Sequence, residues 1–170
     1  MTEVSINKQV KLSEHFTLGE LCKTGVKTAD GNIPSHVHIE NLKRVCEWLE
    51  ELRRRYNLRY DSGSVSPPEL GGEIDTDEPI IITSGYRSPE LNKKVGGSPT
   101  SNHLTGCAVD IRVAGIEQAM RYAVILMDYA DETKQDYDEL LIERNRSGGF
   151  WLHFAVRPKD NRRKTMFLMK

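Results

Sequence analysis

Three side chains of the sequence have the chemistry of metal ligands. His103 and Asp110 lie seven positions apart in the segment SNHLTGCAVDIR, and His153 lies in the apolar run FWLHFAV. Two histidines and one carboxylate make an open zinc site, in which the fourth tetrahedral position is left for water. We therefore predict that these three residues bind Zn²⁺. A site with a bound water is also what a metal-dependent hydrolase needs. The alternative is a buried, hydrogen-bonded pair of His103 and Asp110 without a metal.

Polar residues that precede the first histidine could serve a substrate. Arg87 lies in the turn SGYRS, just after an expected strand. A guanidinium there could hold a peptide carboxylate or stabilise an oxyanion; the alternative is a structural salt bridge. Ser101 could orient a ligand or the substrate, or only make a hydrogen bond within a turn. We assign Arg87, Ser101 and Tyr86 to substrate binding.

These segments together resemble the M15 family of zinc peptidases. The resemblance rests on the pattern S-x-H-x-x-G-x-A-x-D at 101–110, on SGYRS upstream and on WLH at 151–153, within a matching region of about 12–157. The family includes D-alanyl-D-alanine carboxypeptidases, dipeptidases and phage endolysins. The resemblance implies a zinc metallopeptidase that hydrolyses peptidoglycan stem peptides at bonds involving D-amino acids, as a carboxypeptidase or an endopeptidase, by means of a metal-activated water. It also implies that Arg87 acts on the substrate or the oxyanion.

The general base is where this chain departs from the family pattern. Many members carry Glu or Asp three residues before the last ligand histidine, but that position here is Phe150, which cannot transfer a proton. If a hairpin pairs Arg144 with Phe150, Glu143 faces Trp151 and is a diagonal neighbour of His153, with about 7–8 Å between Cα atoms. We therefore predict Glu143 as the base. A register slip of one residue would turn it to the other face and leave a plain surface residue.

The missing acid keeps a second hypothesis open. The chain could be a non-catalytic zinc-binding or cell-wall-binding module that retains the metal cage, similar to the signalling domain of Hedgehog proteins. Hydrolysis of a peptidoglycan fragment by the metal-loaded protein distinguishes the two hypotheses.

The elements that would position these residues indicate an α+β fold. Apolar spacing and capping signals predict helices that begin near Thr17 and that span 36–56, 88–95 and 116–127. Short runs rich in β-branched or alternating apolar residues predict strands at 79–83, 107–113, 139–143 and 150–156, the last two as a hairpin. Residues 128–138 are expected to form a loop. Within the basic tail 157–170, residues 161–164 are expected to face solvent. The resemblance adds an antiparallel sheet with helices packed on it, as in Hedgehog domains and D-Ala-D-Ala peptidases.

The chain is interpreted as a single domain, 1–170. Residues 60–78 are rich in Gly, Pro and acidic side chains and lack periodicity, so they are expected to form a loop insertion, either a lid near the site or a disordered loop.

Composition excludes several other classes of function. The net charge of −1 provides no basic field for nucleic acid, and no apolar run reaches the roughly 20 residues of a membrane span. The N-terminus lacks the apolar core of a signal peptide, and the three cysteines are too far apart for a disulfide framework. We expect a monomer that is made in the cytoplasm and that either reaches the cell wall after lysis or acts on cytoplasmic fragments.

Overall fold

The computed structural model describes residues 7, 9–60 and 77–170, and the part of the predicted insertion at 61–76 lies outside the described residues. The helices are α1 (Leu18–Leu21), α2 (His36–Tyr60), α3 (Pro89–Lys94), the 3₁₀ helix η1 (Asn102–Thr105) and α4 (Ile116–Thr133). The strands are β1 (Ile82–Ser84), β2 (Ala108–Arg112), β3 (Glu139–Arg144), β4 (Phe150–Ala155) and β5 (Lys164–Met169). None of the helices in these ranges has the length and hydrophobicity needed to cross a membrane.

The strands form one sheet in the order β1-β2-β4-β3-β5, with helices packed against it. The predicted α+β class is confirmed, but the expectation of an antiparallel sheet is wrong, because β5 pairs with β3 in parallel. No strand was predicted in the tail 157–170, but Lys164–Met169 forms this edge strand. All six of its side chains are exposed or half-buried, and the run KTMFLM lacks the apolar alternation by which a sequence reveals a strand.

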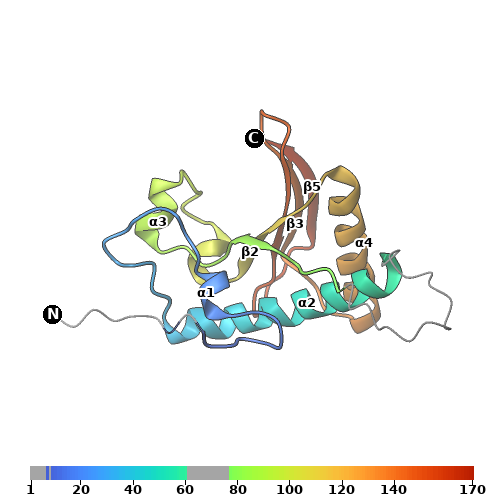
Figure 1. Cartoon of the computed structure of the whole chain (residues 1–170), viewed down its shortest axis with the longest axis horizontal. Coiled ribbons are helices and arrows are strands. Elements are labelled where there is room, and N and C mark those ends of the chain that lie inside the picture. The colour runs from blue at the N-terminus through green and yellow to red at the C-terminus, as the bar shows by residue number, and fades with distance from the viewer. Residues whose placement is uncertain (1–6, 8, 61–76) are drawn as a thin grey trace, which may run out of the picture.

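The two faces of the sheet have different chemistry because successive strand residues point to opposite sides. One face carries apolar side chains into the core under α2 and α4, and these are Val109, Ile111, Leu140, Leu152 and Phe154. The opposite face carries the polar side chains Asp110, Glu139, Glu143 and His153. Figure 1 shows α4 on one side of the strands and α3 on the other, with α2 along the base.

The long helix α2 anchors the core through its apolar stripe. Leu42, Val45, Leu49 and Leu52 recur at three- and four-residue spacing and are fully buried, which confirms the predicted amphipathic helix. Trp48 of α2 lies 5.4 Å, between ring centroids, from Phe154 of β4. The helix therefore packs directly on the strand that also carries His153.

Helix α4 extends beyond its predicted end. The sequence indicated a loop at 128–138, but the helix continues to Thr133 and ends where Lys134 adopts a left-handed φ of 58°. Tyr129 packs edge-on against Trp48, and Ala130 is buried. These two residues continue the packed face of the helix although acidic residues surround them.

Candidate metal centre

The fold brings the three predicted metal ligands together. One ligand atom from each of His103, Asp110 and His153 can be chosen so that all three lie within 4.8 Å of one another. Asp110 on β2 and His153 on β4 are direct partners in the antiparallel ladder, and His103 comes from η1, just before β2. All three residues are buried, so the cluster is held rigidly by its surroundings.

The hydrogen bonds of the two rings show which nitrogens face the centre. His103 Nδ1 lies 2.7 Å from the Gly85 carbonyl oxygen, which can only accept, so Nδ1 carries the proton and Nε2 is directed to Asp110 at 3.4 Å. His153 presents Nδ1 to Asp110 at 2.9 Å and Nε2 to a carboxylate oxygen of Glu139 at 3.3 Å. Two imidazole nitrogens and one carboxylate, with the outer ring nitrogens bonded to oxygen acceptors, fit the donor set of a zinc site.

The electrostatics of this cluster reflect its burial. Burial alone would raise the pKa of Asp110, but His103 and His153 outweigh it and hold that pKa well below its usual range. Burial would lower the pKa of His153, whereas Asp110 and Glu139 raise it above its ordinary value. In the absence of a metal, both carboxylates therefore favour the protonated form of the His153 ring.

The segment that carries His103 is shaped by a serine and a glycine. Ser101 caps η1, and its Oγ accepts the backbone N–H of His103 at 3.3 Å. Gly106 ends η1 in the left-handed region at φ 71°, and a Cβ there would lie 2.7 Å from the carbonyl oxygen of His38. Ser101 thus makes the predicted turn hydrogen bond, and this bond also helps to orient the ligand histidine.

Arg87 lies beside the candidate metal ligands. Its Nη2 donates to Asp110 Oδ2 at 2.7 Å, and its Nε donates to Ser84 Oγ at 2.9 Å. The turn is held close to α1, because the Leu21 carbonyl accepts from the Tyr86 backbone N–H at 2.7 Å and would lie 2.1 Å from a Cβ at Gly85. A side chain at position 85 would clash with this carbonyl, so only glycine fits there. The turn holds the Arg87 guanidinium next to Asp110.

A cavity of about 650 Å³ opens over the cluster. Its lining includes the three candidate ligands together with Arg87, Ser101, Glu139, Leu141, Glu143, Trp151, Arg162, Lys164 and Lys170. Tyr86 is not among the described residues that line it: the ring is buried and stacks on His38 at 4.7 Å between centroids. Tyr86 therefore packs behind the turn in this structure, and its role in substrate binding stays a prediction.

The hairpin has the predicted register. Arg144 pairs with Phe150, Glu143 with Trp151 and Leu141 with His153. Glu143 therefore faces the cavity, and it is only 3% exposed, so it is not a plain surface residue. Its Oε2 accepts a hydrogen bond from Lys170 Nζ at 2.7 Å.

Glu139 is a site residue that the sequence reasoning missed. It lies on the same face of β3 as Glu143 and is the other diagonal neighbour of His153. The hydrogen bond from His153 lowers the pKa of Glu139 to about 2, against the opposing effect of burial and with support from Asn102 and Arg162. The strand alternation that predicted Glu143 on the face of His153 also puts Glu139 on that face, so the sequence contained the pattern that identifies Glu139.

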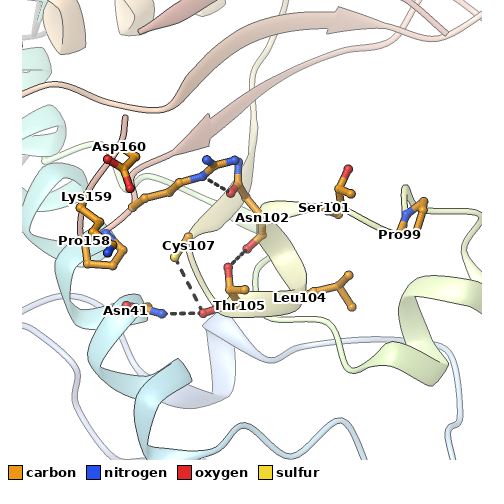
Figure 2. A pocket seen from close by; sticks show the side chains of 12 residues that line it. Asn41, Pro99, Ser101, Asn102, Leu104, Thr105, Cys107, Pro158, Lys159 and Asp160 are labelled. Atoms are coloured by element: carbon orange, nitrogen blue, oxygen red, sulfur yellow. Dashed lines mark hydrogen bonds between the residues drawn. The ribbon is translucent and has the colours of Figure 1, made fainter. Parts of the chain in front are cut away.

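A second pocket, of about 430 Å³, adjoins the first and shares Thr100 and Ser101 with it. Figure 2 shows its wall, with Asn102, Thr105 and Cys107 on one side and Pro158, Lys159 and Asp160 on the other. Asn102 separates the two pockets, because it also contacts Glu139.

Comparison with known proteins supports a peptidase. The family model described as Peptidase M15 matches residues 73–135, a segment that contains Arg87, His103 and Asp110. His153 and both candidate glutamates lie beyond the matched segment, and the structure brings them to the same centre. A comparison with curated proteins gave no match.

Proposed function

We propose that this chain, which is similar to the M15 peptidases over residues 73–135, is a zinc-dependent peptidase that hydrolyses peptidoglycan stem peptides at bonds involving D-amino acids. The observation that carries the proposal is the buried cluster of His103, Asp110 and His153 beneath a cavity that also contains Arg87 and Glu143. These are the ligand, charge and base types that metal-assisted peptide hydrolysis requires.

His103, Asp110 and His153 would hold the zinc ion, which when bound supplies Lewis acidity and lowers the pKa of water. The protein contributes ligand positions that are fixed before any metal arrives. His103 is held by the Gly85 carbonyl, and Asp110 by the backbone pairing of β2 with β4. Little reorganisation is therefore needed at the centre.

Glu143 is the proposed proton carrier. Its carboxylate lines the cavity, on the strand adjacent to that of His153. There it would accept a proton from the attacking water and return it to the leaving amine. The hydrogen bond from Lys170 fixes one carboxylate oxygen and leaves the other for this transfer.

The cationic side chains suit an anionic substrate. Arg87, Arg162, Lys164 and Lys170 all line the cavity, and the last three lie in β5 or within two residues of its ends. Stem peptides carry free carboxylates, which guanidinium and ammonium groups bind well. Arg87 would bind such a carboxylate or the developing oxyanion while its Nε remains on Ser84.

The test begins with metal analysis. Wild-type protein should contain about one zinc per chain, and His103→Ala and His153→Ala should each lose most of it, because each removes one of three protein ligands. His36→Ala is the matched control, since this histidine is exposed on α2 and should keep the metal. Full zinc retention in both ligand variants would refute the site.

Hydrolysis is then measured with zinc-loaded protein and synthetic stem peptides ending in D-Ala-D-Ala, with products identified by mass spectrometry. Cleavage that is lost on chelation and restored by zinc supports the peptidase. Zinc binding without cleavage of any stem peptide would instead favour a non-catalytic zinc module. Phe150 keeps this candidate open, because Phe150 occupies the position at which the M15 pattern has Glu or Asp.

A further inference from the structure

Glu139 makes contacts that Glu143 does not share. Its Oε2 lies 3.3 Å from His153 Nε2, the ring nitrogen that faces away from Asp110. Since His153 Nδ1 is directed to the proposed metal position, a proton on Nε2 is the arrangement that leaves Nδ1 free for the metal. A carboxylate at Nε2 stabilises this tautomer and fixes the plane of the ring.

Asn102 in turn fixes Glu139. Its Oδ1 accepts from Arg157 Nε at 2.9 Å. Because arginine only donates, the amide orientation is determined, and Nδ2 must face the carboxylates of Glu139 at 3.0 Å and Asp138 at 2.7 Å. Asn102, the neighbour of His103 in η1, therefore holds Glu139 in place.

The second oxygen of Glu139 is also engaged. Its Oε1 lies 3.0 Å from Arg162 Nη2 and 3.5 Å from Lys164 Nζ. Both oxygens thus have partners, and the side chain is largely buried at 15% exposure. A carboxylate bound on all sides is suited to hold a ring in place and poorly suited to shuttle protons.

From these contacts we infer that Glu139 is a positioning residue of the metal centre. It holds His153 in the tautomer and orientation in which Nδ1 binds the metal, and Asn102 and Arg162 hold Glu139 for that task. The inference rests on the proposed function, because it concerns the same metal site. It gives the two glutamates of β3 separate tasks: Glu139 acts through His153 on metal binding, and Glu143 acts on the proton.

The experiment compares zinc affinity in Glu139→Ala, Glu139→Gln and Glu143→Gln by competition with a chromogenic chelator. Loss of an outer-shell partner typically weakens metal affinity about 10–100-fold, and we expect that loss for Glu139→Ala. Glu139→Gln should recover part of the affinity, because its amide oxygen can still accept from Nε2. Glu143→Gln, on the same face of the same strand, should bind zinc like the wild type.

The ring itself provides a readout that does not depend on activity. In ¹⁵N-labelled, zinc-loaded wild type, long-range ¹H–¹⁵N correlations should show His153 protonated at Nε2. Glu139→Ala should alter the Nε2 shift or mix the tautomers, while the signals of His36 stay unchanged. Circular dichroism and thermal unfolding establish that each variant is folded, and Glu139→Gln supplies the comparison if Glu139→Ala is not.

The outcomes separate this inference from the proposed function. Wild type that binds no zinc would overturn both. Wild-type zinc affinity and an unaltered His153 tautomer in a folded Glu139 variant would overturn the positioning role alone. If such a variant kept its zinc affinity but lost turnover, Glu139 would be the proton carrier, and the inference would also fall.

Discussion

Replacing Glu143 by glutamine tests whether this chain has a general base. Glu143 faces the cavity from β3 and accepts a hydrogen bond from Lys170 Nζ at 2.7 Å. Glutamine has nearly the same volume, and its amide oxygen can still accept that bond. The substitution therefore preserves the shape of the cavity and removes only the negative charge and the capacity to take up a proton.

We expect a large loss of turnover and only small changes in zinc content and in the free energy of unfolding. A positioned acid–base group contributes about 10²–10⁴-fold, so kcat should fall by that factor, which corresponds to roughly 3–5 kcal/mol of transition-state stabilisation. Zinc content should not change, because Glu143 is not one of the three candidate ligands. The Lys170 side chain is 59% exposed, so loss of the ion pair should change the free energy of unfolding by no more than about 1 kcal/mol.

The assay combines zinc content, thermal unfolding and the kcat and KM of stem-peptide hydrolysis for one preparation of each protein. Glu117→Gln is a matched control, because that side chain is 78% exposed on α4 and does not line the cavity, so its turnover should equal that of the wild type. A folded, zinc-loaded Glu143→Gln protein with wild-type turnover would refute the assignment of the base.

Two further predictions follow from charged groups elsewhere. Arg87→Lys keeps the positive charge but loses the planar fork that contacts Asp110, so kcat/KM should fall by about tenfold or more; unchanged kinetics would make Arg87 a structural partner only. The pKa of Glu51 is lowered from 4.5 to about 2, because hydrogen bonds from Arg54 and Arg55 outweigh burial. Since the folded-state pKa lies below the unfolded one, Glu51 should stabilise the fold above about pH 4.5 and lose this effect as the pH falls toward 2. In acid titrations of the free energy of unfolding, the advantage of wild type over Glu51→Gln, about 1 kcal/mol at neutral pH, should shrink over that interval; a constant difference would contradict the prediction.

Local patterns in the sequence were enough to predict much of the site. The two-residue period of strands placed Asp110 on the polar face of 107–113, and the short turn between 144 and 150 set the hairpin register that aims Glu143 at the cavity. The three- and four-residue spacing of α2 likewise predicted its buried stripe. In each case the pattern spans only a few neighbouring residues, so the local sequence is sufficient to predict which side of the element each side chain faces.

What only the tertiary structure decided are the contacts between distant segments. Strand β5 pairs in parallel with β3 and brings Lys164 and Lys170 to the cavity, yet its own side chains are mostly exposed and carry no strand pattern. Glu139 and Glu143 are equivalent by strand alternation, and their separate environments arise because Asn102 and Arg162 reach one of them and Lys170 the other. These partners lie between 23 and 37 positions away along the chain, and hydrogen bonds over such separations depend on how the elements pack rather than on any local propensity.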